Sequence, residues 1–144
     1  PMYWSEDADA DGMCHGPLDM DTVKMKYGSA EGQQADGDSI YPFVKETIKL
    51  RNQYPAIARG TVTFEDTLSN DAVCVVKKTY QDDELVLVYN LSAEEQTVDV
   101  SSLTVNGISG TSLAVAGELL TGTDEVKYDQ GVVTLPGYSV VVLK

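Results

Sequence analysis

The chain has 144 residues, of which 42% are hydrophobic and 23% charged, so it can form one ordinary domain with an appendage and bury a core. Ten Lys and Arg against 23 Asp and Glu give a net charge of −13. This balance excludes the basic surface that nucleic acids or anionic membranes require, so neither partner is expected. No apolar run approaches the roughly 20 residues of a spanning helix, and membrane insertion is not expected.

The first residue is Pro1 rather than Met, and we therefore expect the chain to have been cut from a longer parent protein. The two cysteines, Cys14 and Cys74, are too few for a disulfide scaffold or a zinc site. They allow at most one disulfide, and their spacing does not decide whether they pair.

Residues 1–38 are predicted to form a long acidic loop. They hold nine acids and two lysines, a net charge of −7, and they show neither a helical nor a strand period. A loop of this length inside a compact domain is usually functional or held by a neighbour.

Residues 39–53 are predicted to form the one amphipathic helix. Ser39 is the expected N-cap, and Pro42 then lies in the first turn, where its missing N–H costs little. Pro55 disfavours the α conformation of the residue before it, so the helix is expected to end at about residue 54. Five residues at helical spacing form one apolar stripe on this helix, namely Ile40, Phe43, Val44, Thr47 and Ile48.

From residue 61 onward the pattern changes to short strands rich in Val, Leu, Thr and Tyr, separated by turn residues such as Asn106-Gly107 and Pro136-Gly137. With no further helix expected, this pattern predicts a mainly β fold, an antiparallel Greek-key β-sandwich preceded by the acidic loop and the helix. The expected strands are 61–66, 71–80, 84–91, 96–101, 112–121, 126–128, 131–135 and 138–143.

The strand region offers little chemistry. The run from Asp82 to Glu84 is interpreted as a solvated hairpin tip. Asn90-Leu91-Ser92 fits the glycosylation pattern, which is common by chance. Four tyrosines alternate with polar residues and are interpreted as half-buried strand aromatics, with a stacking platform for sugar rings as the alternative; they are Tyr80, Tyr89, Tyr128 and Tyr138.

Asp7, Asp9 and Asp11, followed by Gly12, match the opening of a calcium-binding loop, in which oxygen ligands alternate before a sharp turn. The residue at the twelfth position is Leu18 instead of a bidentate Glu. The match is thus half a motif, and a solvated acidic loop is the alternative. His15 beside Cys14 raises a transition-metal site as a further alternative.

Five segments together resemble the α-amylase family of glycoside hydrolases. Pro-Met-Tyr-Trp at 1–4 resembles the segment after the last barrel strand, and 38–51 with 54–60 resembles the last barrel helix and the exit from the barrel. Residues 85–92 and 135–143 resemble the central strand and the final hairpin of the C-terminal domain of that family.

The resemblance implies two domains, a remnant of the catalytic (β/α)8 barrel at 1–58 and a C-terminal β-sandwich at 59–144. It implies a retaining α-glycoside hydrolase as parent, acting on starch or maltooligosaccharides, with its reacting carboxylates upstream of Pro1. No catalytic residue is therefore expected here. Tyr3 and Trp4 would lie past the last barrel strand, at the face that carries barrel active sites, and are candidates for sugar contact.

A free-standing carbohydrate-binding module is the alternative function, and a calcium-dependent adhesion sandwich is a third. Without a barrel, the stripe of Ile40, Phe43, Val44 and Ile48 is expected to be buried on the sandwich or on a second copy of the chain, or residues 1–38 to be poorly ordered. The parent is expected to be an extracellular or cell-surface bacterial protein, on the resemblance alone, and a cytoplasmic location stays open.

Overall fold

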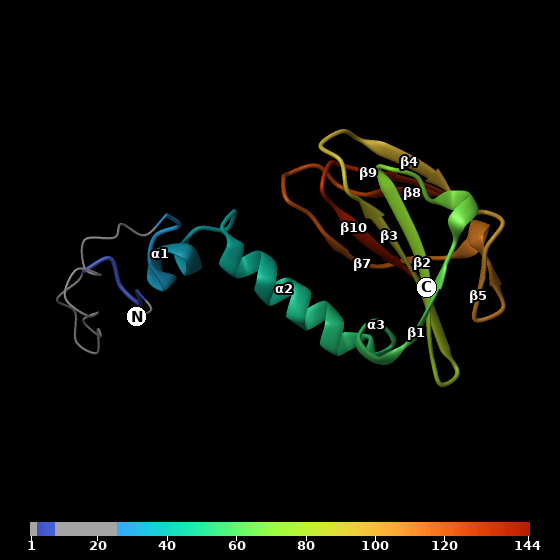
Figure 1. The fold of residues 1–144 in the computed structure, drawn as a ribbon, viewed down its shortest axis with the longest axis horizontal. Helices are drawn as coiled ribbons and strands as arrows, with labels where there is room; N and C mark the ends of the chain where they lie inside the picture. Colours follow the sequence, from blue (N-terminus) through green and yellow to red (C-terminus); the bar gives the residue numbers. More distant parts are fainter. Residues whose placement is uncertain (1–2, 8–25) are drawn as a thin grey trace. The chain divides into compact units, whose positions relative to one another are not determined.

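The computed structural model describes residues 3–7 and 26–144, and Figure 1 shows helices in its first part and strands in the rest. It divides into two compact units, Pro1–Lys45 and Glu46–Lys144, which are described separately. The predicted domain boundary between residues 58 and 59 refers to the longer parent and stays a prediction. None of the helices in the described part is long and apolar enough to cross a membrane.

The first unit contains helix α1 (Ala30–Ala35), which lies inside the segment that was predicted to be loop throughout. Ser29 caps this helix, because its hydroxyl accepts a hydrogen bond from the N–H of Gly32 at 2.9 Å. The loop prediction is therefore wrong for residues 30–35. The helix has six residues and no buried apolar side chain, so it produces no hydrophobic periodicity.

Helix α2 (Ile40–Gln53) confirms the predicted amphipathic helix within one residue at its start. Pro42 lies in its first turn, as expected. The hydroxyl of Ser39, the expected cap, donates a hydrogen bond to the carbonyl of Gln33 at 2.6 Å and so ties the start of α2 to the end of α1.

The apolar stripe of α2 is exposed in this chain. Ile40 and Ile48 are just over half exposed, and Phe43 and Val44 also remain exposed. The expectation that the sandwich buries the stripe is wrong for Ile48, the stripe residue within the second unit, because α2 turns a different side chain, Leu50, toward the sheet. Burial against a second copy stays a prediction.

Helix α3 (Pro55–Arg59) follows α2 after a single residue. Pro55 ends α2, as predicted, and it also begins α3, because its fixed φ suits a first helical position. Ala56 on this helix is fully buried against the sheet. The statement that the chain has one helix is thus corrected to three in the described residues.

The second unit is an antiparallel sandwich of two main sheets with a short extra hairpin, stacked as Figure 1 shows. The larger sheet has the order β1-β2-β3-β10-β7 and the smaller one β4-β9-β8. The fold class and the eight expected strands are confirmed, and the additional hairpin β5–β6 forms at the predicted Asn106-Gly107 turn. The strands are β1 (Thr61–Phe64), β2 (Val73–Tyr80), β3 (Asp83–Asn90), β4 (Gln96–Asp99), β5 (Thr104–Val105), β6 (Ile108–Ser109), β7 (Val115–Leu119), β8 (Lys127–Asp129), β9 (Val132–Leu135) and β10 (Val140–Leu143).

The main core lies between the two sheets. Alternate residues of β2, β3 and β10 face it from the larger sheet, and residues of β4 and β9 face it from the smaller one, which is the two-residue period of strands. Val75, Val88 and Val141 are fully buried there.

The other face of the larger sheet is apolar as well. Val76, Leu85, Leu87 and Val142 form a second buried cluster with Ala56 of α3. The central strands are therefore covered on both faces, which explains why β3 shows a continuous run of buried residues from Leu85 to Val88 instead of alternation.

Asn90 is a buried polar residue at the end of β3. Its side-chain amide donates hydrogen bonds to the carbonyls of Glu94 (2.7 Å), Pro136 (2.9 Å) and Leu135 (3.2 Å). Its carbonyl oxygen accepts from the N–H and the hydroxyl of Ser92. Because the amide nitrogen is buried and occupied by these hydrogen bonds, Asn90 is not accessible to glycosylation in the folded chain.

The predicted solvated hairpin tip is confirmed for Asp82, which is exposed in the turn, and is wrong for the next two acids. Gln81 and Asp82 form the turn, whereas the next two acids are half-buried and paired. Asp83 forms an ion pair with Lys144 at 2.6 Å, and Glu84 forms one with Lys77 at 3.3 Å. The sequence did not indicate these pairs because both lysines belong to other strands or to the chain end.

Replacing Asn90 with Ala should lower the free energy of unfolding by about 2–4 kcal/mol, because three carbonyls lose their donor in a buried place. Thermal and urea denaturation measure the change. Asn52→Ala on the exposed side of α2 is the matched control and should shift stability by at most about 0.5 kcal/mol. Equal stabilities of the two variants would show that the Asn90 hydrogen bonds are not important to the fold.

Candidate functional site

The segment Tyr3–Glu6 is tied to the start of α1. The N–H of Ala30 donates to the carbonyl of Tyr3 at 2.8 Å, and the N–H of Glu31 donates to that of Trp4 at 2.9 Å. The Ser5 hydroxyl donates to the carboxylate of Glu31 at 2.8 Å. These bonds satisfy N–H groups of the first helical turn, which have no partner inside the helix.

Glu6 completes this attachment. Its carboxylate accepts a hydrogen bond from the N–H of Ser29 at 2.8 Å, beside the start of α1. The hydrogen bonds from Ser29 hold the pKa of Glu6 below its ordinary value. A side chain at Gly32 would meet this carboxylate, since a Cβ there would lie 2.7 Å from it. No local pattern indicated this contact, because 23 residues separate its partners.

Of the two predicted sugar-contacting residues, Trp4 is 55% exposed and Tyr3 is half-buried. The backbone carbonyls of both residues accept hydrogen bonds from α1, and these bonds hold the segment that carries the exposed Trp4 ring. Tyr27 is also exposed, with the Lys26 ammonium 5.1 Å from its ring centre. The unit thus offers exposed aromatic surface, and the sugar contact itself stays a prediction.

Asp7 is the one described member of the predicted calcium set, and it is exposed. Asp9 and Asp11 lie outside the described residues, as do Cys14 and His15. Within the described residues there is no group of three His, Cys, Asp or Glu arranged to hold a metal, and Cys74 is a free thiol. The calcium prediction therefore stays open.

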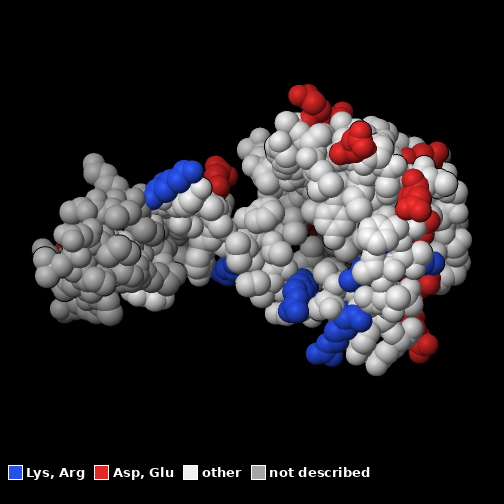
Figure 2. All heavy atoms as spheres, in the orientation of Figure 1, with Lys and Arg blue, Asp and Glu red and all other residues white. Residues whose placement is uncertain are grey.

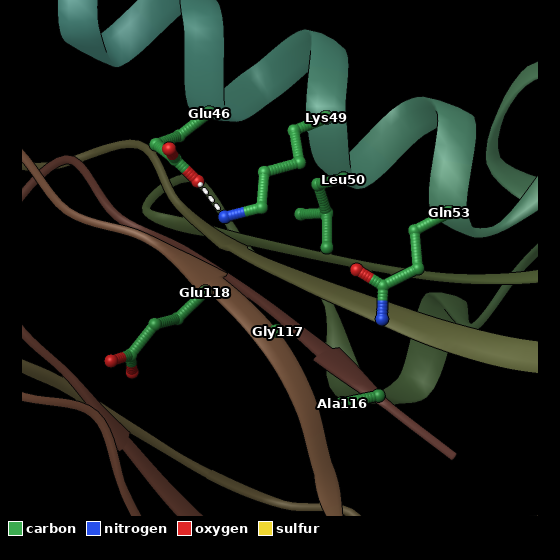
Figure 3. Close-up of a pocket in the computed structure, with 7 residues that line it drawn as sticks. All are labelled: Glu46, Lys49, Leu50, Gln53, Ala116, Gly117 and Glu118. Atoms are coloured by element: carbon green, nitrogen blue, oxygen red, sulfur yellow. Dashed lines mark hydrogen bonds and ion pairs between the residues drawn. The ribbon is translucent and has the colours of Figure 1, made fainter.

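A shallow groove of about 150 Å³ lies in the second unit between α2 and β7. Figure 3 shows Leu50 pointing from α2 toward Gly117 at its floor, beside the ion pair of Glu46 and Lys49. A side chain at Gly117 would collide with Leu50, so glycine permits this close approach. The remaining lining residues are Gln53, Ala116 and Glu118.

Tyr54 fixes the end of α2 beside this groove. Its hydroxyl donates to the carbonyl of Ala116 at 3.0 Å and accepts from the amide of Gln53 at 3.1 Å. The Lys144 ammonium lies 5.7 Å from its ring centre and pairs with Asp83. These contacts hold the end of α2 next to β7, where the groove lies, and Gln53 of its lining is engaged by Tyr54.

The tyrosines of the sandwich divide into two groups. Tyr80, Tyr89 and Tyr128 are half-buried, which confirms their interpretation as strand aromatics. Burial raises the pKa of Tyr89, and the hydroxyl of Tyr128 donates to the carbonyl of Gly110. Tyr138 differs, because it is 59% exposed and adopts a left-handed backbone with φ of 50°.

The described carboxylates with a shifted pKa accept structural hydrogen bonds. Every resolved shift of a carboxyl pKa among them is downward, caused first by hydrogen bonds: from Ser29 to Glu6, from Asn106 to Glu84 and from Ser101 to Asp99. A glycosidase general acid needs a raised pKa and a second carboxyl close by. None of these three carboxyls has the raised pKa that such an acid needs.

Charges of both signs lie on the face of the sandwich shown in Figure 2, with acidic side chains along its upper and right margins and basic ones lower down. This face presents no uniform field of one sign that would attract a highly charged polymer.

The comparisons with solved structures cover almost the whole chain. This chain is 44% identical to Amy13B of Eubacterium rectale over 99% of the length of this chain, with a TM-score of 0.89. An alpha-amylase from H. orenii gives 18% identity over 99% and a TM-score of 0.71, and the alpha-glucosyl transfer enzyme XgtA gives 19% over 99% and 0.72. No protein-family model matches the chain, and no curated protein matches it.

Fold and contacts define a β-sandwich with preceding helices. This unit is found in α-amylase family enzymes, and the chain resembles a part of them, consistent with a C-terminal part. It spans about a quarter of the length of these relatives, namely 26% of Amy13B, 27% of the H. orenii enzyme and 24% of XgtA. The low identities of the last two show the fold alone.

Acid should release the segment Tyr3–Glu6 from α1. Since the pKa of Glu6 is lowered by folding, its contribution is complete above the ordinary value of 4.5 and is lost as the pH falls through the folded value. Amide hydrogen exchange at Ser29 should accelerate relative to unstructured amides over this range.

Glu6→Gln should make that protection weaker at neutral pH and remove its pH dependence. Glu125→Gln, at an exposed position of the sandwich, is the control. Protection at Ser29 that is independent of both pH and the Glu6 substitution would contradict the assignment.

Calcium binding at Asp7, Asp9 and Asp11 predicts heat release in a calorimetric titration and a higher melting temperature with millimolar calcium, because bound ligand stabilises the folded state. Asp7→Asn should reduce both effects, whereas Asp129→Asn on β8 should not. A titration without heat and without a change in melting temperature would remove the prediction.

Proposed function

We propose that this chain is the non-catalytic C-terminal part of an α-amylase-type retaining glycoside hydrolase that acts on starch or maltooligosaccharides. The observation that carries the proposal is the 44% identity to Amy13B across nearly the whole chain, combined with a coverage of only 26% of that enzyme. Glycoside hydrolases among the neighbours support a hydrolase as parent.

In this proposal the reacting carboxylates belong to another part of the parent. Retention requires two carboxyls about 5 Å apart, one of them with a raised pKa. The lowered pKa values of Glu6, Glu84 and Asp99 and their occupation by hydrogen bonds support a structural role for these acids. The sandwich would stabilise the parent, and Trp4 with Tyr3 would contact the α-glucan at the border of its cleft.

An extracellular or cell-surface location forms part of the same proposal, since a polymer such as starch does not enter a cell intact. Self-association through Ile40, Phe43, Val44 and Ile48 is proposed for the isolated chain, because these exposed apolar side chains lie on one helix.

The test is an assay of reducing sugar released from starch. The 144-residue chain should release none, and the full-length parent should release sugar at a rate that Trp4→Ala lowers mainly through a higher KM. Tyr138→Ala, another exposed aromatic remote in sequence, is the control and should leave KM unchanged. Turnover by the chain alone would overturn the division of roles.

A free-standing carbohydrate-binding module is the second candidate, favoured by the exposed rings of Trp4 and Tyr138. Electrophoresis of the chain in gels containing amylose distinguishes it. Retardation that is lost in Trp4→Ala or Tyr138→Ala supports a binding module, and unaltered mobility supports the stabilising role.

A further inference from the structure

The hairpin of β5 and β6 turns through Asn106 and Gly107. Val105 pairs with Ile108 across it, and the φ angles of the two turn residues are 50° and 78°. These are the angles of a two-residue turn for which Asn-Gly is the preferred sequence. Nothing lies within 4 Å of the position that a Cβ of Gly107 would occupy, so the backbone at this turn is sterically open.

Asn106 is bound to a single residue of β3 by three hydrogen bonds. Its side-chain oxygen accepts from the N–H of Glu84 at 2.8 Å, and its side-chain amide donates to the carbonyl of Glu84 at 2.8 Å. Its own N–H donates to the Glu84 carboxylate at 3.0 Å. The amide of Asn106 thus pairs with the backbone of Glu84 as a neighbouring strand would.

This arrangement occupies the group that reacts in asparagine deamidation. In that reaction the backbone nitrogen of Gly107 attacks Cγ of Asn106, a ring closes, and the side-chain nitrogen leaves as ammonia. Water then opens the ring to aspartate or isoaspartate. To reach the Gly107 nitrogen, the Asn106 amide must first leave both backbone partners on Glu84.

We propose that Asn106 is a deamidation site which the folded sandwich protects through Glu84, and whose modification releases the β5–β6 hairpin from β3. Aspartate at this position turns a carboxylate oxygen toward the carbonyl of Glu84, where the amide had donated. It also adds a negative charge beside the Glu84 carboxylate, in a chain whose net charge is already −13.

The hairpin carries a core residue, which extends the effect of this change. Val105, next to Asn106, is fully buried in the main core. Isoaspartate lengthens the backbone inside a two-residue turn, so the pairing of Val105 with Ile108 cannot be kept in register. Deamidation therefore affects the core and not only the surface.

The first experiment follows deamidation by peptide mapping and mass spectrometry of the full-length protein in mildly alkaline buffer, with and without denaturing urea. The two hydrogen bonds from the Asn106 amide to the backbone of Glu84 must open before the reaction, so the native rate at Asn106 should be at least about tenfold below the rate in urea. Asn52-Gln53 on exposed α2 serves as an internal reference in the same digests. Equal native and unfolded rates at Asn106 would overturn the protection.

Glu84→Ala tests whether the carboxylate of Glu84 contributes to the protection of Asn106. Removing the carboxylate leaves the Asn106 N–H without its partner, and the native deamidation rate should rise severalfold while the rate in urea stays the same. Glu125→Ala is the matched control and should change neither rate. A native rate in Glu84→Ala equal to that of the unmodified protein would show that the Glu84 carboxylate does not contribute to the protection, because the two hydrogen bonds to the backbone of residue 84 remain in this variant.

Asn106→Asp tests the consequence without waiting for the reaction. Amide hydrogen exchange at Val105 and Ser109 should be faster than in the unmodified protein and the melting temperature lower, whereas Asn52→Asp should leave the exchange of both amides unaltered. Unchanged exchange in the hairpin of Asn106→Asp would show that the modification does not release it.

Discussion

Burial of the larger sheet on both faces is the constraint on which the rest of the structure depends. One face packs on the smaller sheet, and the other packs on α3 and the end of α2. Each fully buried Val or Leu of the central strands contributes about 1.5–3 kcal/mol. The strands β3 and β10 provide such residues to both faces, so neither cover can be removed without exposing apolar surface of the same strands.

The packing of helices on the second face of the sheet also explains where helix and strand approach each other closely. Gly117 lets Leu50 of α2 approach β7, and Gly60 lies where a side chain would collide with the carbonyl of Ala56. These glycines sit at the joints between helices and sheet. The second half of α2 and α3 are therefore attached to the sandwich by their own packing, and they belong to the same compact unit.

The sequence predicted the sandwich and α2 because both depend on regular patterns. The strands were indicated by runs of β-branched residues between turn residues. The helix was indicated by an apolar stripe that ends before Pro55, and both patterns are local in the sequence. The shorter helices were missed for physical reasons: α1 buries no apolar face, and Pro55 was interpreted only as an end although it also begins α3.

The polar contacts were beyond sequence reasoning because they join distant parts of the chain. Asn90 reaches the carbonyls of Leu135 and Pro136, and the identity of those partners follows from strand order rather than from spacing. The pairing of Glu84 with Lys77 likewise needs the register of β2 and β3. Resemblance to a family identified the fold correctly, but it did not indicate which polar groups hold the ends of the strands.

The half-buried thiol of Cys74 follows from the register of the doubly covered sheet. It lies opposite Tyr89 and packs, partly buried, against the apolar cluster on the helix-facing side of the sheet. The alkylation rate of this thiol consequently reports how accessible the helix-facing side of the sheet is, in the isolated chain and in any larger assembly. No engineered label is needed for this measurement.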